Sequence, residues 1–69
     1  MFRDIDYAAI AVETAIREKF SRQNGLEDLK VTAKEKTISV TDDHNSIEGT
    51  RDDLLAAIRR VSAYADLWT

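Results

Sequence analysis

The residues best suited to chemistry lie together in one stretch, TDDHNSIEGT, residues 41–50. This stretch holds the only histidine of the chain, His44, next to Asp42 and Asp43, with Glu48 a short way downstream. Carboxylate oxygens and imidazole nitrogens bind calcium or zinc and carry protons in acid–base catalysis. The stretch is therefore the first candidate for a metal or catalytic site.

The spacing of these residues matches no known metal pattern. The D-x-D-x-D-G order of a calcium loop is absent, and a zinc site needs about three or four ligands held by supporting groups. Asp, Asn, Ser and Gly are also the residues that turns prefer, because their side chains bond the local backbone or tolerate unusual dihedrals. We favour a spacer between two elements. Asp42, Asp43 and His44 remain weak metal candidates, Glu48 a weaker one, and we expect no cofactor.

Catalytic patterns are absent elsewhere too. The chain contains no G-x-S-x-G, no glycine-rich phosphate loop and no H-E-x-x-H, and it has no cysteine. Sixty-nine residues are also too few for a ligand cleft of about 300 Å³ or more unless the chain oligomerises. We therefore expect a protein that is not an enzyme.

The elements that would position this stretch follow from hydrophobic periodicity. From Asp4 to Asn24, apolar residues recur at steps of three and four, which predicts a helix that Asp4 caps and Gly25 ends. A second helix is predicted from Thr50 to Asp66. The apolar stripe of the first helix consists of Ile5, Ala8, Ala9, Val12, Ala15, Ile16 and Phe20.

Between the helices, LKVTAKEKTISVT (residues 29–41) alternates apolar and polar residues in two runs. Pairing Ala33 with Ile38 and Val31 with Val40 places all the apolar side chains on one face, with the turn across residues 34–37. The sequence thus predicts a single α+β domain over residues 1–69, a helix–β-hairpin–helix (αββα). Both helices would pack on one face of a two-stranded antiparallel sheet, because an isolated hairpin is marginal in water.

The first helix carries more apolar surface than one buried face requires. Tyr7, Ile10, Ala11 and Thr14 form an outer strip, away from the core stripe. Clustered exposed apolar residues mark partner contacts, although Phe2 or the C-terminal residues folding over the strip, or ordinary scattered apolarity, would explain it equally well. We hypothesise a homodimer through this strip.

Two residues near the C-terminus, Leu67 and Trp68, are further interface candidates. Tryptophan is enriched at the hot spots of protein interfaces. The alternative, which we favour for Trp68, is that it continues the apolar stripe of the second helix into the core.

Composition narrows the choice of partner. The net charge of −3 argues against nucleic acid and anionic membrane surfaces, which attract clustered Lys and Arg. No apolar run approaches the roughly 20 residues of a membrane span, and acidic residues interrupt the N-terminal stretch where a signal peptide would be apolar. We therefore expect a cytoplasmic protein whose partner is another protein.

The run LKVTAKEKTISV with a helix on each side resembles a BON domain, a family of envelope-associated modules that contact membranes or proteins. The chain departs from that pattern, since it has no export signal, no glycine after the second strand and no clear third strand. In element order and length it is also similar to small head–tail connector proteins of tailed phages.

These observations favour a non-enzymatic protein-interaction module, such as a small phage or bacterial inhibitor or adaptor that occludes a partner surface. One alternative is a structural assembly component of the connector type. The other is a metal- or ligand-binding domain that uses residues 42–48.

Overall fold

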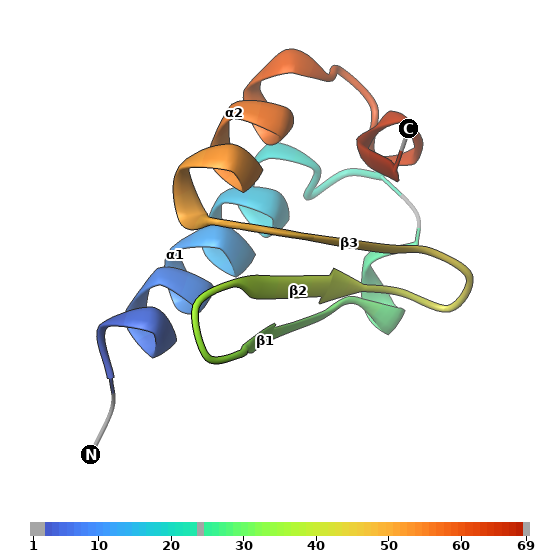
Figure 1. Cartoon of the computed structure of the whole chain (residues 1–69). Coiled ribbons are helices and arrows are strands. Elements are labelled where there is room, and N and C mark those ends of the chain that lie inside the picture. The colour runs from blue at the N-terminus through green and yellow to red at the C-terminus, as the bar shows by residue number, and fades with distance from the viewer. Residues whose placement is uncertain (1–2, 24, 69) are drawn as a thin grey trace.

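The computed structural model describes residues 3–23 and 25–68. Figure 1 shows a small antiparallel sheet with α1 and α2 packed together beside it and the C-terminal turn closing one end. Helix α1 packs on β1, β2 and α2, while α2 also contacts β3. In chain order the elements are α1 (Asp4–Lys19), the 3₁₀ turn η1 (Leu26–Asp28), β1 (Lys30–Ala33), β2 (Ile38–Thr41), β3 (Ser46–Gly49), α2 (Arg51–Arg60) and the 3₁₀ turn η2 (Tyr64–Trp68).

The α+β class expected from the sequence is confirmed, but the two-stranded sheet is not. The sheet has three strands in the order β1-β2-β3, so the arrangement is αβββα. The third strand is formed by Ser46–Gly49, which lie in the stretch 41–50 that was predicted to be a spacer. It forms because β2 would otherwise leave the N–H and C=O groups of one edge unpaired beside the core.

The register predicted for the first hairpin is confirmed. Val31 pairs with Val40 and Ala33 with Ile38, and the Lys34 N–H donates to the Thr37 carbonyl at 2.8 Å across the turn. On the opposite face, Ser39 is only 8% exposed rather than open to solvent as a two-stranded sheet would leave it, since β3 flanks it.

Helix α1 begins and ends differently from the prediction. Its N-terminal cap uses Asp6 rather than Asp4: the Arg3 N–H donates to the Asp6 carboxylate at 2.8 Å. The helix ends at Lys19, well before Asn24, which lies outside the described residues. Phe20 already leaves helical geometry, and its side chain is fully buried in the core.

Helix α2 begins as predicted, with the Asp53 N–H donating to the Thr50 hydroxyl at 3.2 Å, but it ends at Arg60 instead of Asp66. Val61 is extended, so the chain turns back and η2 packs on the core. The Lys19 ammonium donates to the carbonyls of Ile58 and Arg59, which places a cation at the negative end of the α2 dipole.

The core joins the helices, the sheet and the C-terminal turn η2. Its centre is Ile16 from α1, Phe20 directly after α1, and Ile38 and Val40 from β2, each fully buried. The other buried apolar residues are Ala9, Val12, Leu29, Leu54, Ile58, Tyr64 and Leu67.

None of the helices within the described part of the chain combines the length and apolarity needed to cross a bilayer.

The glycine that opens η1 gives a first testable prediction. Gly25 has φ +102°, and a Cβ added there would lie 3.1 Å from the Tyr64 ring. We expect Gly25→Ala to lower the free energy of unfolding by about 1–2 kcal/mol, because an L side chain is strained at positive φ. Urea denaturation measures the change.

Gly49→Ala is the matched control, because a Cβ at Gly49 meets its nearest atom, Asp53 Cβ, at 3.4 Å and no positive φ is involved. We expect the control to cost less than Gly25→Ala. Equal losses for the two variants would contradict the assigned backbone strain.

Candidate functional site

The stretch that contains Asp42, Asp43 and His44 folds into a compact turn at the tip of the β2–β3 hairpin. The Asp42 carboxylate oxygen Oδ1 accepts hydrogen bonds from the backbone N–H groups of His44 at 3.0 Å and Asn45 at 2.8 Å. The Asn45 side-chain amide adds a third bond to Oδ1 at 3.1 Å. The Asp42 N–H itself donates to the Asn45 carbonyl at 3.0 Å. Asp42 therefore shapes this turn through its side chain.

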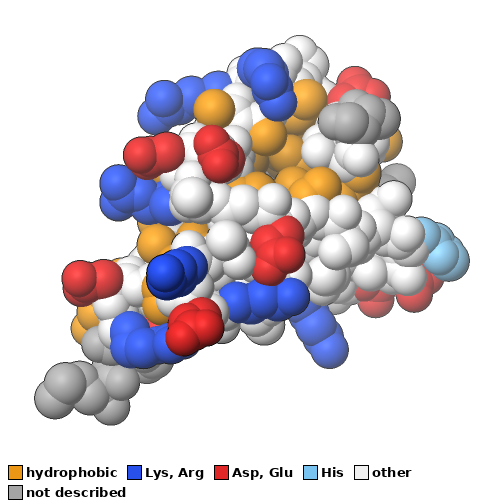
Figure 2. All heavy atoms as spheres, viewed as in Figure 1, with side chains coloured by type: hydrophobic (Ala, Val, Ile, Leu, Met, Phe, Trp, Pro, Cys, Tyr) orange, Lys and Arg blue, Asp and Glu red, His pale blue; other side chains and the backbone are white. Residues whose placement is uncertain are grey.

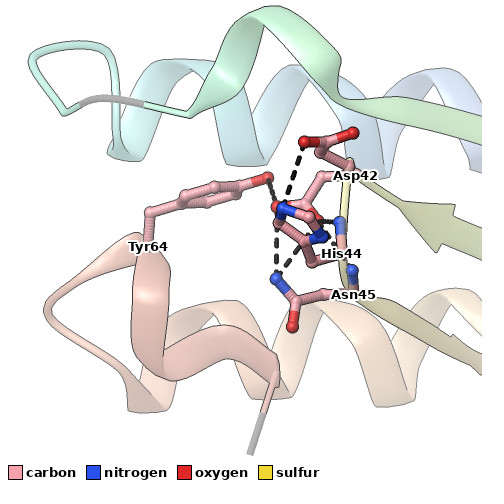
Figure 3. Close-up of polar contacts among 5 residues, drawn as sticks. Asp42, His44, Asn45 and Tyr64 are labelled. Atoms are coloured by element: carbon pink, nitrogen blue, oxygen red, sulfur yellow. Dashed lines mark hydrogen bonds and ion pairs between the residues drawn. The ribbon is translucent and has the colours of Figure 1, made fainter.

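The second oxygen of Asp42 ties the turn to the C-terminal segment. Figure 3 shows the Tyr64 ring reaching across to Asp42, where its hydroxyl donates to Oδ2 at 3.1 Å. Burial of Asp42 alone would raise its pKa, but the hydrogen bonds from His44, Asn45 and Tyr64 outweigh burial and lower it. Burial and then the Asp42 carboxylate raise the pKa of Tyr64 to about 12. The pair is thus held as a carboxylate and a neutral phenol at neutral pH.

The three weak metal candidates do not converge. Asp43 and His44 are exposed and contact each other, with 3.2 Å between Asp43 Oδ2 and His44 Nε2. Asp42 instead directs both of its oxygens to protein donors. Within residues 3–23 and 25–68, no three His, Cys, Asp or Glu side chains group so that they could hold an ion. The arrangement is that of a structural turn joined to Tyr64.

The outer strip of α1 is exposed along its length. Tyr7 is 59% and Ile10 51% exposed, and these are the large hydrophobic side chains that the described part of the chain leaves open. Ala11 and Thr14 are exposed beside them. The residues therefore lie together on one surface, as the helical spacing predicts, away from the buried Val12 and the rest of the core stripe.

The C-terminal candidates lie elsewhere. Leu67 is 3% exposed and belongs to the core, so only a small part of its side chain reaches the surface. Trp68 is half-buried and packs edge-on against the Tyr64 ring, with 5.6 Å between ring centroids. Trp68 therefore packs against the core from η2 and does not continue the stripe of α2.

A groove that sequence reasoning missed lies between β3, α2 and η2. Figure 2 shows apolar side chains gathered in this hollow, bordered by charged groups. Its volume is about 530 Å³, so the expectation that a chain this short cannot form such a cleft is wrong. The groove exists because η2 folds back instead of extending α2. Its lining residues are Ile47, Glu48, Asp53, Leu54, Ala57, Arg60, Val61, Asp66 and Leu67.

One sequence signal pointed toward this groove. Ile47 is an isolated apolar residue in the polar stretch 41–50, a pattern typical of a side chain that packs against the core. It does pack against the core, but as part of β3, paired with Val40. The short strand could not be recognised by alternation, because it contains this one large apolar side chain.

No family model matches the chain, and neither a curated protein nor a solved structure matches it. The resemblances to BON domains and to phage connectors thus stay predictions based on element order.

The link between the hairpin tip and η2 generates a stability prediction. Tyr64→Phe keeps the buried ring but removes the hydroxyl that donates to Asp42. We expect a loss of about 1–2 kcal/mol in the free energy of unfolding, typical of a hydrogen bond to a charged acceptor. The matched control is the same substitution in an Asp42→Asn background, where the hydroxyl no longer faces a carboxylate. Equal effects in urea denaturation would show that the Tyr64–Asp42 bond contributes nothing specific.

The same pair sets a pH dependence at both ends of the scale. Because folding raises the pKa of Tyr64 to about 12, its stabilisation is complete below the unfolded value near 10 and is lost between about pH 10 and 12. Because folding lowers the pKa of Asp42, its contribution is present above the unfolded value near 4 and is lost as pH falls below it. We expect Tyr64→Phe to flatten the alkaline limb, and Asp42→Asn the acid limb, in stability measured against pH. Wild-type slopes in both variants would contradict this assignment.

Proposed function

We propose that this protein is a non-enzymatic protein-interaction module and that the outer strip of α1 (Tyr7, Ile10, Ala11 and Thr14) is its contact surface. The observation that carries the proposal is the exposure of Tyr7 and Ile10, at 59% and 51%, on a helix whose other face already completes the core. Folding gains little from these two side chains at this degree of exposure. Covering them would remove apolar surface from water at about 25 cal/mol per Å².

The composition of the strip suits an interface. Tyrosine brings a large apolar ring with a polar tip and is enriched at binding hot spots. Ala11 and Thr14 are small, so a partner backbone or helix can approach closely beside Tyr7 and Ile10. Binding at this strip would act by occlusion of a partner surface, as expected of an inhibitor or adaptor of phage or bacterial origin.

The strip gives a matched pair of substitutions for testing the proposal. Ala11→Glu places a charge inside the strip, and Ala56→Glu places the same charge on an exposed alanine of α2 outside it. We expect Ala11→Glu to weaken capture of a partner from the lysate of the natural host by about tenfold or more, because a carboxylate would be desolvated at the interface. Ala56→Glu should capture the partner as the wild type does. Light scattering and circular dichroism verify that both variants fold.

Ile10→Glu should reproduce the loss. Undiminished capture by Ile10→Glu and Ala11→Glu, with both folded, would overturn the assignment of the strip. Loss in Ala56→Glu alone would move the interface to α2.

A second copy of this chain is one candidate for the partner. A dimer would suit a domain of this size, since it buries further apolar area without lengthening the chain. If the strip self-associates with micromolar affinity, sedimentation at about 50 µM should give mostly dimer for the wild type. Ile10→Glu should sediment as a monomer. A monomeric wild type would contradict the dimer hypothesis and leave a different protein as the partner.

A further inference from the structure

We propose that the groove between β3, α2 and η2 is a self-association surface, through which α2 of one copy packs antiparallel against α2 of a second copy. Asp53 of each copy would pair with Arg60 of the other. This goes beyond the contact surface proposed on α1, because association through the groove leaves the α1 strip open for a different protein.

Two charged side chains of the groove have no ion-pair partner in the described part of the chain. Asp53 and Arg60 line the groove and are exposed, and the ion pairs of the described residues include neither of them. The other two carboxylates of the lining are engaged, since Glu48 pairs with Lys34 at 3.3 Å and Asp66 interacts within the chain. The groove thus presents one carboxylate and one guanidinium, which balance in charge.

The spacing of these two charges favours pairing between copies over pairing within one. Asp53 and Arg60 are seven residues apart in α2, which is about two turns, or about 10.5 Å along the axis. They lie on the same side of the helix, but ion pairs within a helix form between residues three or four apart. An antiparallel second copy of α2 places an Arg60 opposite each Asp53. A parallel copy would place like charges opposite each other.

The residue between the two charges suits a close helix contact. Ala57 lies on the same side of α2 as Asp53 and Arg60 and also lines the groove. A side chain this small lets two helix axes approach to about 8 Å. Beside it, Ile47 and Val61 are half-buried, so the contact would remove apolar surface from water between the two ion pairs.

The groove has room for what the second copy brings. Its volume of about 530 Å³ accommodates the apolar stem of an arginine, which can lie along the lining while the guanidinium reaches Asp53. The contact is closed by a two-fold axis, so both copies use the same surface. The axis also brings the acidic first turn of each α2 to the basic last turn of the other.

The backbone edge of β3 is the competing surface on this side of the molecule. β3 is the last strand in the order β1-β2-β3. Because the Asp42 N–H bonds the Asn45 carbonyl, and hydrogen-bonded pairs alternate along an antiparallel ladder, Ile47 and Gly49 exchange bonds with β2. The backbone groups that point away from the sheet are those of Ser46 and Glu48. An open edge accepts a strand of any charge, whereas the charges of α2 select a second copy.

The test is sedimentation of the whole chain from about 10 µM to about 1 mM, where we expect a wild-type dimer with Kd of about 10–100 µM. Asp53→Arg places two cations opposite each other and Arg60→Asp two anions, so each variant alone should dimerise at least about tenfold more weakly. Asp52→Arg and Arg59→Asp are the matched controls, because both residues are exposed on α2 outside the groove. The controls should stay within about twofold of the wild type.

Mixing the two groove variants gives the sharpest result. A copy with Asp53→Arg and a copy with Arg60→Asp hold opposite charges at both crossed positions, so the mixture should associate within about threefold of the wild type. Damage to the fold by either substitution would not be repaired by mixing. If a reversal does not fold by circular dichroism, Arg60→Gln should weaken the dimer about threefold or more, with Arg59→Gln unchanged as its control.

Several results would overturn the proposal. These are a wild type that stays monomeric at about 1 mM, charge reversals that dimerise as the wild type does, and a mixture that associates no better than its components. NMR shifts on concentrating the protein should include the methyls of Ala57 and Val61. Shifts confined to the amides of Ser46 and Glu48 would assign the association to strand pairing at the β3 edge instead.

The groove and the α1 strip fail independently. Ile10→Glu lies outside the groove, so it should leave this dimer intact while it weakens capture of a different protein by the strip. Asp53→Arg should abolish the dimer and leave that capture unchanged. A dimer that is lost in Ile10→Glu and kept in Asp53→Arg would place self-association on the α1 strip and contradict the groove.

Discussion

The structure depends on the burial of β2. Ile38 and Val40 are fully buried in the same core as Ile16 of α1 and Phe20, the residue directly after α1. A strand buried in this way needs hydrogen-bond partners along both of its edges, since unpaired backbone groups beside an apolar core cost free energy comparable to a lost hydrogen bond. β1 satisfies one edge and β3 the other. The third strand therefore follows from the core that the two helices and the first hairpin already define.

Two surfaces lie outside the core once the chain has folded: the outer strip of α1 and the groove beside β3. The C-terminal segment returns because Gln23 accepts the Tyr64 N–H at 2.7 Å and Asp42 accepts the Tyr64 hydroxyl. Its return buries Leu67 and, with α2, forms the groove beside β3. The outer strip of α1 stays exposed, because the opposite face of the helix meets both the sheet and α2. Both proposed binding surfaces are thus consequences of how the core is completed.

The parts of this fold that could be predicted are those with a repeated apolar pattern. Alternation was enough for the β1–β2 register, and helical spacing was enough to place Tyr7 and Ile10 on an exposed strip. β3 has too few apolar residues to show alternation. Its formation follows instead from the second edge of β2, whose backbone groups would otherwise lack hydrogen-bond partners. The end of α2 and the groove depend on tertiary contacts of Lys19 and Tyr64, which no local pattern contains.

The central claim is that β3 pairs with β2 along one edge and leaves the other edge open. Amide hydrogen exchange of the free chain, followed by NMR, tests it residue by residue. We expect slow exchange at Ile47 and Gly49, whose N–H groups face β2, and fast exchange at Ser46 and Glu48. Fast exchange at all four amides would show that these residues form a loop, and slow exchange at all four would show that the edge is covered; either result would contradict the account.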